Sequence, residues 1–187
     1  HHTPYKFILM SMGFSEGELD REIRHVQSMD YTHRGGDTPV HVATFGIVQE
    51  YLTDNWHGLI ARMLRDAAPA AAYMATRIKR RETLHTVWYR DMVALQIEAN
   101  PRLLPYVAEA LLKFEMPGNT LVPHLQHQVT QWMPRMGADF DQITRDLVRL
   151  VQTTMSDAAM TGRLLVEIAA ERGMSLGPLS PRLIQSA

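Results

Sequence analysis

The hydrophobic and polar positions along this chain repeat mainly with the period of an α-helix. Apolar residues recur every three or four positions in the stretches 40–65 and 70–99. This spacing places them on one face of a helix, whereas a half-buried strand would alternate apolar and polar residues. Turn-forming residues separate the two stretches at 66–69, and Asn100-Pro101 ends the second. The pattern therefore predicts two long helices joined as an antiparallel hairpin.

Shorter helical patterns lie on both sides of this hairpin. No capping residue precedes the stretch 1–13, so it is expected to be the end of a helix that starts upstream. Ser15 and Glu18 form a capping-box pattern, which opens a helix that ends near residue 31. Further helices are expected at about 102–114, 119–132, 139–155 and 157–172. We predict a single all-α domain over residues 1–176 and a loose tail over 177–187.

Composition excludes several classes of function. The chain has 19 basic and 20 acidic residues and a formal charge of −1, so no basic excess favours binding to nucleic acid or to an anionic membrane. It has neither a spanning apolar run nor a charged-then-apolar leader, so a cytoplasmic protein is expected. It has no cysteine, which excludes disulfides, thiolate-bound metal sites and cysteine nucleophiles. Any metal site must therefore use His, Asp or Glu.

Carboxylates interrupt the apolar faces of both long helices. Glu50 lies on the inner face of the first helix, and Glu82 and His85 lie three residues apart on the second. Burying a lone carboxylate costs several kcal/mol, and a bound metal ion compensates that cost. Both glutamates are 16 residues from Asp66 in the turn, so each lies about 24 Å from it at a helical rise of about 1.5 Å. The two carboxylates are therefore expected to come level across the hairpin.

Other polar residues on these helices have more ordinary interpretations. Judged from the residues alone, His57 is a core histidine and Thr53 bonds back onto its own helix. A second Glu-x-x-His pair, Glu22 and His25, is expected on the surface because His25 lies away from the apolar stripe. The basic cluster at 77–81 is read either as a solvated helical face or as a docking surface for an acidic carrier.

The Glu50, Glu82 and His85 pattern is half of the ligand set of a bundle-type di-iron or di-manganese centre. In such centres two helices each give one Glu, and two others each give a Glu-x-x-His pair. Oxygen and imidazole ligands without sulfur suit iron or manganese. The spacing therefore predicts a metal centre inside a helical bundle.

These residues resemble those of the soluble acyl-carrier-protein desaturase family. Gln49-Glu50 with Thr53 and His57-Gly58 is similar to the family helix that gives a lone Glu ligand, and Glu82 to His85 is similar to its second Glu-x-x-His motif. Met116-Pro117 resembles the Met-Pro helix break that follows this second motif in the family. The resemblance implies that Glu50 is a terminal ligand, Glu82 a bridging carboxylate and His85 an imidazole ligand. It also implies a catalytic role for Thr53 near the oxygen-binding side, and it places the first motif's histidine at His1, with His2 as the alternative.

The resemblance also implies a fold and a reaction. The fold would be a ferritin-like antiparallel helical bundle with extra C-terminal helices, holding two iron ions, with manganese as the alternative. The enzyme would use O2 and electrons from a ferredoxin-type donor to introduce a cis double bond into a fatty acyl chain. That chain would arrive on acyl carrier protein, and the enzyme would be a homodimer.

The sequence departs from the family pattern in two ways. The first lone-Glu helix, and the Glu of the first motif, would both lie upstream of residue 1. The acidic residue that precedes the second motif's Glu in the family is Arg81 here. Two further functions therefore stay open, because fold does not determine reaction. One is a di-iron hydroxylase or N-oxygenase on the same scaffold, and the other is a non-catalytic ferritin-like subunit.

Overall fold

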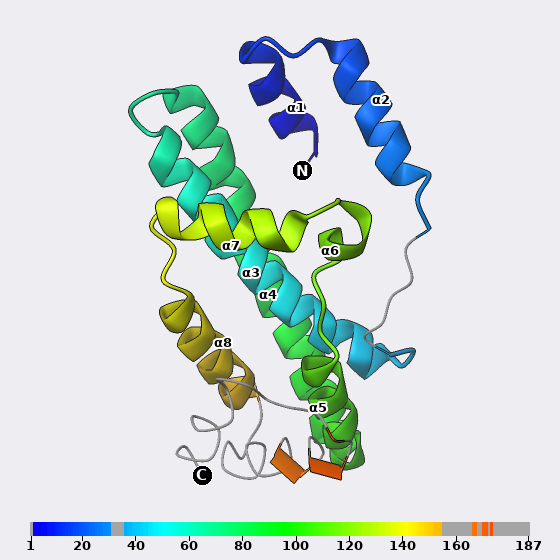
Figure 1. The fold of residues 1–187 in the computed structure, drawn as a ribbon. Coiled ribbons are helices and arrows are strands. Elements are labelled where there is room, and N and C mark those ends of the chain that lie inside the picture. The colour runs from blue at the N-terminus through cyan, green and yellow to red at the C-terminus, as the bar shows by residue number, and fades with distance from the viewer. Residues whose placement is uncertain (1, 31–35, 155–165, 168–169, 172, 174–187) are drawn as a thin grey trace.

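The structure, a computed structural model, describes residues 2–30, 36–154, 166, 167, 170, 171 and 173 (Figure 1). All regular secondary structure in these ranges is helical, which confirms the all-α prediction of a helical bundle. None of the described helices has both the length and the apolarity needed to cross a bilayer.

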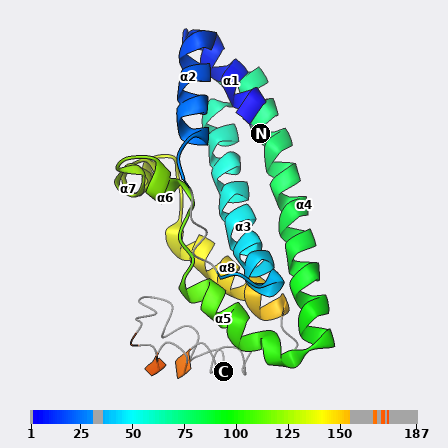
Figure 2. The ribbon, with the colours of Figure 1, turned by 90° about the vertical axis from the view of Figure 1, so that its right-hand side faces the viewer.

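Two long helices form the centre of the fold. α3 (Pro39–Leu64) and α4 (Pro69–Ala99) run antiparallel and side by side, as the hydrophobic pattern predicted (Figure 2). α3 begins after Thr38, whose hydroxyl caps the helix by accepting a hydrogen bond from the His41 amide. Each helix has a proline in its first turn, where the missing N–H costs nothing. The hairpin therefore arises from local signals at both helix starts.

The main apolar core lies at the end of the hairpin that is far from the α3–α4 turn. Two short elements follow α4 there, the 3-10 helix η1 (Pro101–Leu103) and α5 (Leu104–Leu112), and α8 (Phe140–Thr154) packs beside them. The buried side chains of this core come from α3, α4, α5 and α8, and they are Val40, Ala43, Ile47, Val93, Leu104, Val107 and Val151. This core holds α3 and α4 in register. The polar residues Glu50, Glu82 and His85 lie outside it, nearer the middle of the two helices.

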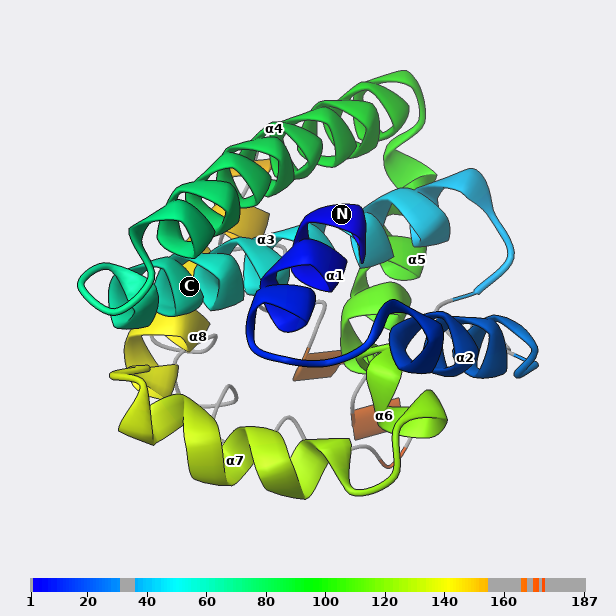
Figure 3. The ribbon, with the colours of Figure 1, turned by 90° about the horizontal axis from the view of Figure 1, so that it is seen from above.

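The N-terminal helices lie at the opposite end of the hairpin. α1 (His2–Ser11) lies close to the turn between α3 and α4, and α2 (Glu16–Gln27) follows it (Figures 1 and 2). The predicted capping box is present, because the Ser15 amide donates to Glu18 Oε2 over 3.0 Å and the Glu18 amide donates to Ser15 Oγ over 3.3 Å. Seen from above, α4 runs along one side of α3, and α6 (Gly118–Leu121) and α7 (Leu125–Arg135) lie on the other (Figure 3).

The helix predicted at 119–132 is in fact divided into α6 and α7. The two are separated at Val122, which has an extended backbone, and at His124, which is left-handed with φ of 60°. Pro123 explains the break, because it lacks an amide hydrogen and disfavours a helical conformation at the residue before it. The helix predicted at 157–172 lies largely outside the described residues, and the tail at 177–187 lies wholly outside them.

Close contact between α3 and α4 depends on Gly46, one helical turn before Glu50. A Cβ atom at Gly46 would lie 2.7 Å from ring atoms of Tyr89, which is too close for an unstrained contact. We expect Gly46→Ala to lower the free energy of unfolding by up to about 2 kcal/mol, because overpacking outweighs the gain in helix propensity. Equilibrium unfolding in urea, followed by circular dichroism, measures this change.

Gly17→Ala in α2 is the matched control. The atom nearest to a Cβ at Gly17 is the tip of Arg21 at 3.8 Å, so the added methyl group meets no obstacle. This variant is expected to be as stable as the wild type or more stable, by up to about 1 kcal/mol. Equal stability of the two alanine variants would show that Gly46 does not limit the packing of the hairpin.

Candidate metal centre

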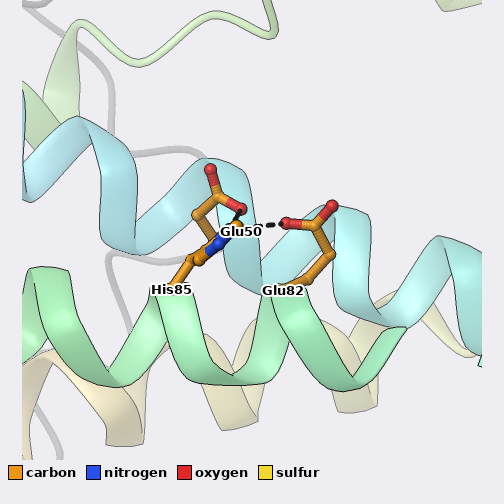
Figure 4. A group of neighbouring side chains, drawn as sticks. All are labelled: Glu50, Glu82 and His85. Atoms are coloured by element: carbon orange, nitrogen blue, oxygen red, sulfur yellow. Dashed lines mark hydrogen bonds and ion pairs between the residues drawn. The ribbon is translucent and has the colours of Figure 1, made fainter. Parts of the chain in front are cut away.

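The structure brings together three side chains from the two central helices. Glu50 comes from α3, and Glu82 and His85 come from α4 (Figure 4). Each offers one potential ligand atom, and these atoms lie within 4.8 Å of one another. Among the described residues, these three side chains form the one cluster of His, Asp or Glu that is compact enough to hold a metal ion. The two carboxylates do come level across the hairpin, as the equal spacing from the turn indicated.

His85 lies close to both carboxylates. Its Nδ1 atom is 3.2 Å from Glu50 Oε2 and 3.4 Å from Glu82 Oε2. The Glu82 side chain is only 4% exposed, whereas Glu50 is 15% and His85 is 31% exposed. The group therefore has a buried side at Glu82 and a more accessible side at His85.

Burial and mutual repulsion shape the electrostatics of this group. Burial raises the pKa of Glu50 to about 7, and the hydrogen bond and negative charge of Glu82 add to the increase, against a smaller opposing effect of His85. Near neutral pH, the Glu50 carboxyl therefore still binds a proton for much of the time. A cation bound between the carboxylates would take the place of that proton and remove the repulsion.

The residues present fit a hard or borderline metal ion. Two carboxylates and one imidazole are the ligand types that suit iron and manganese. In a helical bundle, a lone Glu from one helix and a Glu-x-x-His pair from its neighbour make half of a dinuclear ligand set. The described part of the chain therefore supplies half of the ligands of such a centre. A cation bound there would reduce the electrostatic repulsion between the Glu50 and Glu82 carboxylates.

A second layer of polar groups lies behind Glu82. His57 Nε2 on α3 is 3.6 Å from Glu82 Oε1, and the Tyr5 hydroxyl on α1 is 2.6 Å from His57 Nδ1. Burial lowers the pKa of the His57 imidazole, and burial together with the charge of Glu82 raises the pKa of Tyr5 to about 12. Both groups are therefore expected to be neutral at pH 7. Sequence reasoning missed Tyr5, because nothing local relates it to a histidine 52 residues away.

The other predicted site residues, Thr53 and His1 or His2, are not among the three side chains that meet at the candidate centre. The Thr53 hydroxyl donates to the backbone carbonyls of Gln49 and Glu50 at 3.0 and 3.1 Å, which is the back-bonding expected from the residues alone. His1 lies outside the described residues. His2 is exposed, and its Nε2 is 3.4 Å from Thr3 Oγ1. The catalytic role of Thr53 and the metal-binding role of His1 stay predictions.

The basic cluster predicted on α4 divides between two faces. Lys79 Nζ donates to both carboxylate oxygens of Asp54, at 2.8 and 2.9 Å, so its charge is paired across the hairpin. The three arginines of the cluster, Arg77, Arg80 and Arg81, instead line an open groove of about 590 Å³ beside α1. The other side chains that line this groove are those of Pro4, Met74, Ile78 and Leu84. The other Glu-x-x-His pair, Glu22 and His25, is exposed, as predicted.

Comparison with known proteins identifies one family. The family model described as fatty acid desaturase matches residues 5–154, which include Tyr5, Glu50, Glu82 and His85. No curated protein and no solved structure matches the chain.

Proposed function

Because the chain belongs to the fatty acid desaturase family, we propose that it is a di-iron oxidoreductase that introduces a cis double bond into a carrier-bound fatty acyl chain. The observation that carries this proposal is the meeting of Glu50, Glu82 and His85 inside the matched region. Carboxylate and imidazole ligands on facing helices are the means by which helical bundles hold di-iron and di-manganese centres. The desaturase activity would use O2 and electrons.

We assign three described residues to the proposed cofactor of two iron ions, for which manganese is the alternative. Glu50 would be a terminal ligand, Glu82 a bridging carboxylate and His85 an imidazole ligand, and His1 is proposed as a further ligand. When bound, the metal would activate O2, which is the oxidant that removes two hydrogens from an unactivated carbon chain and, with two electrons from the donor and two protons, is reduced to two water molecules. The protein's own residues would hold the ions, and the burial of Glu82 would limit the access of water to that ligand.

The charges beside α1 support one of the proposed protein partners, the acyl carrier protein. The groove of Arg77, Arg80 and Arg81 presents positive charge beside α1, which complements an acidic acyl carrier protein. A ferredoxin-type protein is the proposed electron donor, and the enzyme is proposed to be a homodimer, as in the family. The cytoplasm is the proposed location.

Product analysis tests this function directly. The iron-loaded protein is incubated with O2, a ferredoxin reducing system and stearoyl- or palmitoyl-carrier protein, and the released fatty acids are analysed by mass spectrometry. We expect a cis-monounsaturated product that depends on both O2 and reductant. A Glu82→Gln variant should form none, while Glu22→Gln, which alters the exposed Glu-x-x-His pair, should match the wild type.

The same assay separates the proposed function from its alternatives. A hydroxylated acyl chain without the alkene would identify a hydroxylase on the same scaffold. A protein that binds no metal and forms no product would instead be a non-catalytic ferritin-like subunit. Either result would overturn the desaturase proposal.

A further inference from the structure

Tyr5, His57 and Glu82 form a row of polar groups that crosses three helices. The row starts on α1, passes through α3 and ends at the ligand candidate on α4 that is buried most deeply. The rings of Tyr5 and His57 are also stacked, with their centroids 5.5 Å apart and an angle of 25° between their planes. Both nitrogens of the His57 ring thus face a specific partner.

The donor and acceptor roles along this row follow from the chemistry of each group. Glu82 in its ionised form can only accept hydrogen bonds, so it is best faced by an N–H group. If the proton of neutral His57 were on Nδ1, the lone pair of Nε2 would face Glu82 Oε1, which lies 3.6 Å away. If the Tyr5 hydroxyl donates to Nδ1, the imidazole proton is on Nε2 and is directed at the carboxylate. The second arrangement avoids repulsion between the lone pairs.

We propose that Tyr5 and His57 are a positioning pair, in which Tyr5 selects the Nε2–H tautomer of His57 and His57 thereby orients the Glu82 carboxylate. Glu82 Oε1 is held toward His57, which leaves Oε2 directed at His85, where it lies 3.4 Å from Nδ1. The contact between His57 Nε2 and Glu82 Oε1, at 3.6 Å, is longer than a hydrogen bond, so the orienting effect is the electrostatic attraction of the N–H group for the carboxylate. The pair belongs to the layer behind the ligands, whose polar partners set ligand orientation and affinity. This inference rests on the proposed metal centre.

The positioning pair has two structural consequences. His57 is a support for a ligand and not itself a ligand, because its Nε2 lone pair is occupied by the proton. In addition, the contact ties α1 to the hairpin, since the hydrogen bond joins residues that are 52 positions apart. Docking of α1 and the orientation of Glu82 are therefore linked through one imidazole ring.

The tautomer can be measured without any metal. Two-dimensional NMR of the metal-free, ¹⁵N-histidine-labelled protein, above the pH at which His57 titrates, distinguishes the two ring nitrogens by their shifts and couplings. The His57 signals, assigned by their loss in His57→Gln, are expected to show the Nε2–H form in the wild type and a shift toward a tautomer mixture in Tyr5→Phe. Tyr73→Phe is the matched control, because Tyr73 on α4 is 65% exposed. An Nδ1–H tautomer in the wild type, or an unchanged tautomer in Tyr5→Phe, would overturn the proposal.

Metal affinity tests the effect on Glu82. Titration with Co²⁺, followed by its visible absorption, is expected to show a loss of affinity of about tenfold in Tyr5→Phe and none in Tyr73→Phe. His57→Gln, whose amide can place an N–H near the position of Nε2, should bind more tightly than His57→Asn, whose amide is nearer to Nδ1. Urea unfolding of each metal-free variant separates loss of affinity from loss of folding.

A double-mutant cycle shows whether Tyr5 acts through His57. Adding Tyr5→Phe to His57→Gln should weaken Co²⁺ binding no further, because the amide has no tautomer to select. Additive losses would overturn the proposed order of action. If the wild-type protein binds no Co²⁺, the metal centre and the positioning of its ligand both fail, whereas the NMR result still decides whether Tyr5 sets the state of His57.

Discussion

Replacing Glu82 with glutamine is expected to weaken metal binding by at least about 100-fold, because loss of groups that only support a ligand already costs about 10- to 100-fold. Glutamine keeps the shape of the side chain and removes its charge. Glu82 is buried, so solvent has little access to the position of the carboxylate oxygen that becomes an amide nitrogen. Titration with Co²⁺ or Fe²⁺ under anaerobic conditions, together with metal analysis of the purified protein, measures the effect.

The metal-free form of this variant is expected to fold. The substitution removes a negative charge from beside Glu50, and that charge is one of the causes that raise the pKa of Glu50. The pKa of Glu50 should therefore move back toward its ordinary value. Glu22→Gln is the matched control, because it changes an exposed Glu-x-x-His pair outside the site. Equal metal binding by Glu82→Gln and Glu22→Gln would remove Glu82 from the ligand set.

The affinity for metal is expected to rise steeply with pH up to about 7, which is the pKa of Glu50. A metal ion must displace the proton that Glu50 holds, so each pH unit below this value should weaken binding by about tenfold through this residue. Between about pH 5 and pH 7, the contribution of Glu50 is therefore about 100-fold. Co²⁺ titrations across this range, made in a buffer that does not bind the ion, provide the measurement.

Glu50→Gln isolates this contribution. The variant should bind metal more weakly at neutral pH, and its affinity should vary with pH by about one proton less than that of the wild type. The same slope in both proteins would show that another group controls the pH dependence.

The metal-free protein gives a second control on the same carboxyl group. The pKa of Glu50 is raised from 4.5 to about 7 in the folded state, so the folded protein holds a proton that the unfolded chain has already lost in this range. The stability contributed by this proton is present below about pH 4.5 and is lost as the pH rises toward 7. Urea unfolding at several pH values should show this decrease in the wild type, and Glu50→Gln should lack it.

The sequence predicted the hairpin and the meeting of its carboxylates because both depend on local geometry. A capping threonine and a proline set where α3 begins, a proline sets where α4 begins, and a constant helical rise turns equal sequence distances from the turn into equal heights. Glu50 and Glu82 come level for this reason. The break at Pro123 is also a local effect, but the helical pattern on either side of it led to the prediction of one continuous helix.

What the sequence alone determined about this protein is the class of fold, the central hairpin and the three side chains that meet across it. The tertiary structure decided which groups lie around them. It joined Tyr5 to His57, paired Lys79 with Asp54 and turned the three arginines of α4 toward a groove beside α1. The physical reason is that helical periodicity is a property of neighbouring residues. Long-range contacts and burial, and with them the high pKa of Glu50, depend on how whole helices pack.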